Sequence, residues 1–434
     1  MPGTRILGRS RGAVIVAGLA LAALAVPAGV AAGARPPQTR HARSAPGRPG
    51  AGGDGGWAGS WYAAPSWNST ELGSGPVTVR NVVHLSIGGS QVRLRLTNAF
   101  GSAPLTIQQV TVALPASSGS TTAAARDVHE VTFGGSAQVT IPAGAEVASD
   151  PVSMAVPAGQ DLLVSAGVPA SSVPATFHLH ATQTNFYAAG DGHAADTSAS
   201  AFTNTTVSWF YVSGVDVRNP AARGSIVTLG DSITDGVTST PGANDRWPDD
   251  LARRLAQLPA NRQCGVLNAG ISGNRVLLDG SALPGYAAAG QSAVARLQRD
   301  VLSRTGVRTL IVYEGINDII WEPHELNPQA IIAGLRQIAV QAHLDGIRVI
   351  GATISPAGGY AEGFDAQQEA VREAVNRWIR DSHVFDAVAD FDAVLRDPAD
   401  PQRIAPMYDS GDDLHPNDAG YAALANALKL DEVC

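Results

Sequence analysis

The stretch "SIVTLGDSITDG" (residues 225–236) decides the fold of the second half of the chain. Its first six residues form a mostly apolar run that ends in glycine, and Asp231 and Ser232 follow at once. A short apolar run bounded by turn residues is typical of a strand that is buried on both faces of a parallel sheet. The serine after it has two interpretations: it is a nucleophile at a strand end, or it caps a helix, as Asp and Ser commonly do.

Similar runs recur along the chain and alternate with helical patterns. The further strand-like runs are 265–270, 308–315, 347–354 and 383–388. Apolar residues spaced three and four apart indicate helices near 246–258, 290–304, 328–345, 365–381 and 417–430. Strands that alternate with helices predict a doubly wound α/β domain with a five-stranded parallel sheet, whose ligands bind outside the carboxyl ends of the strands. We place this domain at residues 224–434.

The region before it, residues 57–217, has the pattern of short antiparallel strands. In "VVHLSIGGSQVRLRLTN" (82–98), apolar and polar residues alternate on both sides of Gly88-Gly89, which predicts a hairpin with its turn at these glycines. Pro and Gly separate the later strand-like pieces. We therefore predict an all-β sandwich or jelly-roll domain ahead of the α/β domain.

The first 56 residues have the composition of an export signal followed by a tether. Arginines precede an uncharged stretch at 12–34 whose small residues suit cleavage, so residues 1–34 are interpreted as a secretory signal peptide. An uncleaved membrane anchor is the alternative, because the stretch nearly reaches the length of a spanning helix. Residues 35–56, rich in Pro, Gly, Ala and Arg, are predicted to be a disordered linker.

Composition restricts the partners and the compartment. The net charge is −8 and the body of the chain has no Lys/Arg run, which argues against binding to nucleic acid or, once the signal is removed, to membranes. Arginine outnumbers lysine by far, which indicates a GC-rich bacterial genome, and the signal predicts a secreted, extracellular protein. In an oxidising compartment, Cys264 and Cys434 are expected to form one disulfide, with two free thiols as the alternative.

A base and an orienting acid for a serine nucleophile occur together in "GDDLHPND" (411–418). A serine hydroxyl needs a base within hydrogen-bond reach, and that base needs an acid to orient it. Asp412 precedes His415 by three residues in a tight turn, so its carboxylate can accept from the imidazole Nδ1. The alternative is a capping loop with an incidental histidine.

Donors for a developing oxyanion occur at two other strand ends. "NAGISGNR" (268–275) ends the second predicted strand in glycines, so the backbone N–H of Gly273 can approach a ligand closely. "EGIND" (314–318) ends the third predicted strand, where Asn317 offers a side-chain amide. Seen alone, the two phrases also fit an ordinary strand-to-helix turn and an Asn turn.

Together, the phrases "GDSITDG", "SGN", "GIND" and "DDLHPN" resemble the four sequence blocks of the SGNH hydrolases, also called the GDSL esterase/lipase family. The resemblance covers about residues 224–434. It departs from the family name only at Ile233, where that name has leucine. It implies a flavodoxin-like parallel sheet and a reaction without a metal or other cofactor.

The resemblance also implies a role for each candidate residue. Ser232 is the nucleophile, His415 is its base, and Asp412 orients that base. The backbone N–H groups of Ser232 and Gly273 and the side-chain amide of Asn317 form the oxyanion hole.

From Trp57 onward, through "GANDRWP" (242–248) and "EGINDI" (314–319), the chain is similar to a bacterial subgroup of secreted esterases with a β-rich N-terminal domain. The resemblance implies a serine esterase that hydrolyses carboxylic esters through an acyl-enzyme. We expect short acyl groups, such as acetyl, on a small molecule or a polysaccharide. The alternatives are a lipase or phospholipase for longer acyl chains and a non-catalytic carbohydrate-binding or wall-associated protein. The oligomeric state does not follow from the sequence.

Two further features have no role in this scheme. His178 and His180 of "TFHLHAT" (176–182) share one face of a predicted strand, where they form either a metal site or a structural pair. We interpret them as a structural pair, because the sequence supplies no evident third ligand. "WEPHEL" (321–326) has the aromatic and polar mix of a substrate-binding loop, although it also fits an ordinary surface loop.

Overall fold

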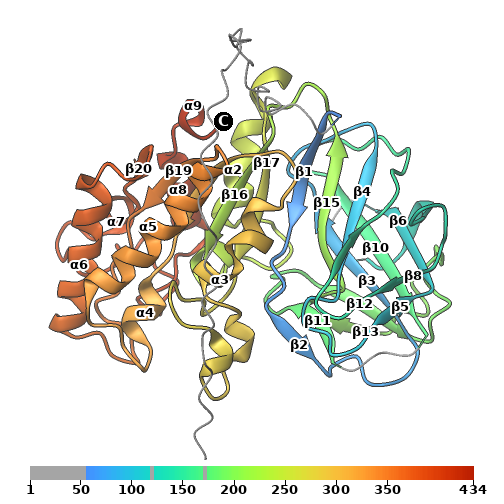
Figure 1. Cartoon of the computed structure of the whole chain (residues 1–434), viewed down its shortest axis with the longest axis horizontal. Coiled ribbons are helices and arrows are strands. Elements are labelled where there is room, and N and C mark those ends of the chain that lie inside the picture. The colour runs from blue at the N-terminus through green and yellow to red at the C-terminus, as the bar shows by residue number, and fades with distance from the viewer. Residues whose placement is uncertain (1–54, 118–121, 170–173) are drawn as a thin grey trace, which may run out of the picture. The chain divides into compact units, whose positions relative to one another are not determined.

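The computed structural model describes residues 55–117, 122–169 and 174–434 (Figure 1). The predicted signal peptide (1–34) and nearly all of the predicted linker (35–56) lie outside these ranges. All described residues belong to one compact unit, Pro49–Cys434. None of the helices in the described ranges combines the length and the apolarity needed to span a bilayer.

Antiparallel strands fill the N-terminal part of this unit, up to Arg218. One sheet has the order β1 (Trp57–Tyr62), β15 (Val212–Arg218), β4 (Val92–Thr97) and β9 (Glu146–Ala148). The largest has the order β13 (Asn204–Thr206), β12 (Asn185–Ala189), β3 (Val77–His84), β10 (Asp161–Val168), β6 (Gln109–Pro115) and β7 (Ala125–Val131). Smaller sheets consist of β14 (Trp209–Phe210), β11 (Ala175–His178) and β2 (Trp67–Ser69), and of β5 (Leu105–Ile107) and β8 (Val139–Ile141). Side chains from the two larger sheets share one hydrophobic core, as in a sandwich.

The predicted hairpin at Gly88-Gly89 is wrong. β3 pairs with β12 and β10, whereas β4 pairs with β15 and β9, so the two strands belong to different sheets. A Cβ atom at Gly88 would collide with the carbonyl oxygen of Val156, and one at Gly89 would lie 2.7 Å from the carbonyl oxygen of Arg218. The glycines therefore allow a close passage of the backbone between two other segments, and they do not form a hairpin turn.

The C-terminal part is built on the predicted five-stranded parallel sheet. Its order is β17 (Gly265–Gly270), β16 (Ser225–Gly230), β18 (Val307–Tyr313), β19 (Arg348–Ala352) and β20 (Ala387–Ala389). In chain order this is 2-1-3-4-5, the flavodoxin-like arrangement, which confirms the predicted fold class. The last strand is shorter than the predicted run 383–388 and begins later. The first residue of that run, His383, has φ +54°, which is incompatible with an extended strand.

Helices cover both faces of this sheet (Figure 1). One face carries α3 (Ala293–Leu297), which continues as a π-helix (Gln298–Leu302), α5 (Pro328–Leu344) and α6 (Ala366–Asp381). The other face carries α2 (Trp247–Ala256), α7 (Phe391–Leu395), α8 (Asp418–Ala427) and α9 (Leu430–Val433). Successive strand residues point to opposite faces, so Ile226 enters one core and Val227 the other. The predicted helix 417–430 is interrupted between α8 and α9, because Leu428 and Lys429 are extended.

Short helices occupy the connections. α1 (Ser232–Asp235) follows β16 directly, and α4 (Ile316–Ile320) follows β18. The 3₁₀ turns are η1 (Ala260–Arg262), η2 (Gly280–Ala282) and η3 (Ala287–Ala289). In Figure 1, α4 lies toward the lower edge and α9 toward the upper edge, so the carboxyl ends of the parallel strands point downward.

The N-terminal part covers the edge strand β17 of the parallel sheet. The Val266 N–H donates to Ser86 Oγ (2.9 Å), and Ala63 forms a parallel bridge with Asn268. A Cβ atom at Gly265 would collide with the carbonyl oxygen of Gly59, so the two backbones pack at glycine distance. An exposed edge strand can pair with a strand of another chain, and here the N-terminal part of the same chain covers this edge.

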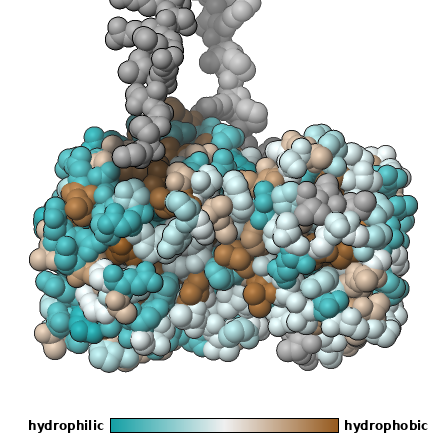
Figure 2. All heavy atoms as spheres, turned by 90° about the horizontal axis from the view of Figure 1, so that it is seen from below, coloured by the Kyte–Doolittle hydropathy of each residue, from teal (hydrophilic) through white to brown (hydrophobic). Residues whose placement is uncertain are grey.

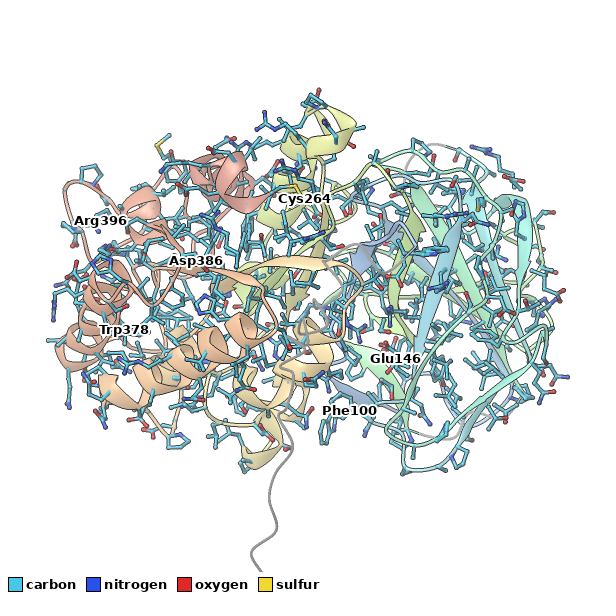
Figure 3. All side chains as sticks on the ribbon, turned by 45° about the horizontal axis from the view of Figure 1, so that its top comes forward. Phe100, Glu146, Cys264, Trp378, Asp386 and Arg396 are labelled. Carbon is cyan, nitrogen blue, oxygen red and sulfur yellow. A yellow bond between two sulfur atoms is a disulfide. The ribbon has the colours of Figure 1, made fainter. Side chains whose placement is uncertain are left out.

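The two cysteines form the disulfide expected from their count. Cys264 immediately precedes β17 and Cys434 ends the chain, with 6.0 Å between their Cα atoms (Figure 3). The bond joins positions 170 residues apart and attaches the C-terminus to the amino end of the sheet.

Candidate active site

Ser232 lies at the first position of α1, at the carboxyl end of β16. Asp231 caps this single helical turn, since its side chain accepts from the Ile233 N–H (2.9 Å), and Gly236 ends the turn with φ +97°. The cap in the Gly-Asp-Ser sequence is thus the aspartate. The serine side chain is left to face another element, although the residue is only 5% exposed.

That element is the loop between α7 and α8, which brings His415 to the serine. The imidazole Nε2 lies 2.9 Å from Ser232 Oγ, and its Nδ1 lies 2.6 Å from Asp412 Oδ2. The other carboxylate oxygen of Asp412 accepts the backbone N–H groups of Leu414 (3.0 Å) and His415 (2.8 Å). The tight turn therefore locks the carboxylate, and the carboxylate orients the ring.

The environment keeps Asp412 ionised and separates it from its neighbour. Partial burial raises the pKa of Asp412, but the hydrogen bonds from the His415 ring and backbone outweigh burial and hold the pKa well below its usual range. Asp413 has φ +59°, which turns its side chain away, and both of its oxygens accept from Arg403 (2.8 and 2.9 Å). Only one of the two adjacent acids reaches the histidine.

Gly273 lies in the loop that follows β17. Its φ is +78°, and a Cβ atom there would lie 2.6 Å from the Trp321 ring, so both the backbone angle and the space require glycine. Among the described residues, neither its N–H nor that of Ser232 donates to a protein acceptor. These two backbone donors are therefore available to a ligand.

Residues of α4 hold the Gly273 loop in place through hydrogen bonds. The buried Asn317 donates one Nδ2–H to the Asn274 carbonyl oxygen (2.9 Å), and the second N–H of the same amide is available for another acceptor. Asp318 accepts the backbone N–H groups of Val276 (2.7 Å) and Leu277 (3.1 Å). The phrase "EGIND" (314–318) therefore helps to hold the end of "NAGISGNR" (268–275) and the residues after it in place.

A group of buried acids that the sequence analysis missed lies behind the site. Burial raises the pKa of Asp231 to about 7 and that of Asp318 to about 6. Burial and the negative charge of Asp231 also hold the pKa of Glu314 well above its usual range. Within the described part of the chain, the Glu314 carboxyl oxygens have no hydrogen-bond partner, and its nearest cation is Arg296 at 3.9 Å. The sequence could have pointed to these acids, because Asp231, Glu314 and Asp318 all lie in the phrases at the ends of predicted strands.

Aromatic side chains line the outer side of the Gly273 loop. The ring centroids of Trp321 and Tyr286 are 4.8 Å apart, and Tyr286 is 47% exposed. Burial, with the nearby Glu362 carboxylate, raises the pKa of the half-buried Tyr360 to about 12. Trp321 comes from the "WEPHEL" phrase, whereas nothing in the sequence marked the two tyrosines, which come from other loops.

A serine, a histidine and an aspartate hydrogen-bonded in series at the carboxyl ends of a doubly wound sheet are the constellation of serine hydrolases. Residues 228–423 match the model of the GDSL-like lipase/acylhydrolase family, and this part of the chain belongs to that family. The SGNH resemblance is thereby confirmed. The protein is a carboxylic ester hydrolase.

Matches to solved structures cover about half of the chain. A GDSL-like lipase from Bacteroides thetaiotaomicron is 18% identical, and the match covers 48% of this chain and 87% of that one with a TM-score of 0.36. An acetylxylan esterase from Geobacillus stearothermophilus, solved as a catalytic mutant, is 21% identical, with 49% and 94% covered and a TM-score of 0.36. No curated protein sequence matches the chain.

Proposed function

We propose that the protein is a secreted bacterial serine esterase that removes short acyl groups, such as acetyl, from carbohydrates through an acyl-enzyme on Ser232. The observation that carries the proposal is the hydrogen-bonded series from Ser232 Oγ through the His415 ring to Asp412. Ser232 Oγ attacks the ester carbonyl carbon while its proton passes to His415 Nε2. The bond to the alcohol oxygen then breaks, and the alcohol leaves with that proton. A water molecule, deprotonated by the same nitrogen, attacks the acyl carbon, and the acid leaves as the bond to Ser232 Oγ breaks and the proton returns to that oxygen.

The proposed oxyanion hole comprises three donors. The backbone N–H groups of Ser232 and Gly273, and the second N–H of the Asn317 amide, donate to the negative charge that develops on the carbonyl oxygen. Their fixed positions support this role, because donors that need no rearrangement stabilise a developing charge most effectively.

The aromatic pair beside the Gly273 loop supports a sugar as the alcohol part of the substrate. Trp321 and the exposed Tyr286 supply aromatic rings of the kind on which sugars stack, and polar groups lie close to Trp321 in the sequence, where His324 Nε2 is 3.1 Å from Glu322 Oε1. Figure 2, seen from below, looks onto the edge at the carboxyl ends of the strands, where hydrophobic residues are interspersed among hydrophilic ones. Such a mixed surface suits a polar substrate better than a lipid interface.

Secretion rests on the predicted signal peptide at residues 1–34. The Cys264–Cys434 disulfide supports it, because such bonds persist in oxidising compartments.

The test compares the wild type with Ser232→Ala on p-nitrophenyl esters of graded chain length and on acetylated polysaccharides. We expect the wild type to prefer acetyl esters and to release acetate from the polysaccharides, and the variant to fold normally without activity. A serine-directed phosphonate should label Ser232 alone. Label elsewhere, or full activity in the variant, would refute the serine mechanism. A preference for long acyl chains would instead favour a lipase.

A further inference from the structure

His178, the last residue of β11, makes a buried contact with the nucleophile turn. Its ring Nε2 lies 2.9 Å from Asp235 Oδ1, and its Nδ1 lies 2.8 Å from the Ala64 carbonyl oxygen. The His178 and Asp235 side chains are 3% and 4% exposed. Asp235 is the last residue of α1, three positions after Ser232. A histidine of the N-terminal part therefore pairs with the helix that carries the nucleophile.

The contacts define the protonation state of this pair. Both nitrogens of the ring face oxygen atoms that accept hydrogen bonds, so both carry a proton and His178 is an imidazolium. Burial lowers the pKa of His178, but the negative charge and hydrogen bond of Asp235 outweigh burial and raise the pKa. The pair is a buried ion pair in which each member satisfies the other's charge.

The second oxygen of Asp235 links the pair to the oxyanion loop. Asp235 Oδ2 accepts the backbone N–H of Ser272 (3.0 Å), and the next residue is Gly273. One carboxylate thus joins three features: the β11 histidine, the turn that begins at Ser232 and the loop that presents the Gly273 N–H. Neither residue of the ion pair touches the His415 or Asp412 side chains through any hydrogen bond in the described ranges.

We propose that His178 is a positioning residue for catalysis: through Asp235 it holds the nucleophile turn and the Gly273 loop in register. The proposal rests on the proposed roles of Ser232 and Gly273. His178 of the "TFHLHAT" phrase thereby acquires a function in addition to packing. The N-terminal β-rich part thus supports the catalytic edge indirectly, because without His178 the Asp235 carboxylate loses a hydrogen-bond donor that fixes it.

A second ion pair across the same junction provides a matched control. Arg304 donates to both oxygens of Glu146 (3.1 and 3.0 Å), and Glu146, in β9, is labelled in Figure 3. Arg304 lies just before β18, at the amino ends of the parallel strands, whereas Asp235 lies at their carboxyl ends. Breaking this pair perturbs the same junction without touching the catalytic edge.

The experiment measures kcat and KM for p-nitrophenyl acetate per active site titrated with a phosphonate, together with Tm. We expect His178→Ala to lower kcat by about ten- to a hundredfold with KM nearly unchanged, because small displacements of catalytic groups cost this much. His178→Gln, which retains a donor for Asp235, should restore kcat to within about fivefold of the wild type. Glu146→Gln should lower Tm and leave kcat unchanged.

Normal kcat in folded His178→Ala, or an equal loss of kcat in Glu146→Gln, would overturn the proposal. If His178→Ala does not fold, Asp235→Asn tests the same link from the other side. The asparagine side chain has one oxygen, so it cannot accept from His178 and from the Ser272 N–H on separate oxygens as Asp235 does. We therefore expect kcat to fall, and a normal kcat would refute the positioning role of His178. These outcomes are distinct from failure of the proposed function, in which the wild type itself would not hydrolyse the ester.

Discussion

Replacing Asp412 by asparagine tests whether the carboxylate orients the imidazole of His415. The amide oxygen of the substituted side chain can still accept the backbone N–H groups of Leu414 and His415, as Asp412 Oδ1 does at 3.0 and 2.8 Å. The amide nitrogen then faces the ring at the position of Oδ2, 2.6 Å from Nδ1 in the native turn. A donor at this position favours the ring tautomer that carries its proton on Nε2, which cannot accept the proton of Ser232.

The size of the effect follows from the surroundings of the carboxylate. The same substitution in a fully buried catalytic triad lowers kcat about 10⁴-fold. The Asp412 side chain is 40% exposed, so water screens part of its charge and can assist tautomer exchange. We therefore expect a decrease in kcat of about a hundred- to a thousandfold, or roughly 3–4 kcal/mol in activation free energy, with KM changed little.

Asp413→Asn is the matched control, because it makes the same chemical change one residue away. That carboxylate pairs with Arg403 near the surface, and exposed ion pairs contribute little to stability or catalysis. Both variants are assayed for kcat per phosphonate-titrated site over a range of pH. Equal losses, or a larger loss in Asp413→Asn, would refute the assignment of Asp412 as the orienting acid.

Three further predictions concern the side-chain amide of Asn317, the disulfide and a buried acid. Asn317→Ala should lower kcat by about a hundred- to a thousandfold with little change in KM, whereas a purely structural turn residue would lower Tm and leave kcat per titrated site normal. Cys434→Ser, which opens a link spanning 170 residues, should lower the free energy of unfolding by at most about 5 kcal/mol on chain-entropy grounds and leave kcat unchanged; equal denaturation midpoints would contradict this. Burial raises the pKa of Asp231 to about 7, so the native state retains a proton that the unfolded chain loses above about pH 4, and stability decreases as the pH rises through this window. Asp231→Asn, which still caps α1, removes this dependence, so its Tm relative to the wild type should increase from about pH 4 to 7; a constant difference would refute the coupling.

The strands of the parallel sheet were predictable because each is buried on both faces. Ile226 and Val227 point into different cores, so the sequence of β16 is a mostly apolar run with a clear end. The predicted bounds 225–230 and 265–270 agree with β16 and β17, whose ends are set by glycines. At the far edge the run 383–388 misled the prediction, because Val384 and Phe385 are apolar residues that pack into the core ahead of the short strand β20.

In the antiparallel part, the sequence predicted strands but not how they pair. Alternation around Gly88 and Gly89 predicted the individual strands β3 and β4, but it assigned the wrong partner to each. A hairpin and a crossover between two sheets have the same alternating pattern, since either keeps one face of each strand buried. Only the carbonyl oxygens of Val156 and Arg218, which come from distant segments, explain why both positions are glycine.

The sequence by itself determined the chemistry of the candidate site, since Ser232, Asp412 and His415 each lie in a short phrase whose residue types and spacing are local properties. It also determined the fold class, because the period of apolar residues reports the burial of each element. Tertiary structure alone decided which groups meet: the 2.9 Å contact between His415 and Ser232, and the pairing of His178 with Asp235 across 57 residues of chain. Such contacts depend on how whole elements pack against one another, and no local pattern encodes the partner of a buried polar group. The histidine that looked structural in the sequence therefore became a candidate for positioning the nucleophile only once β11 lay against α1.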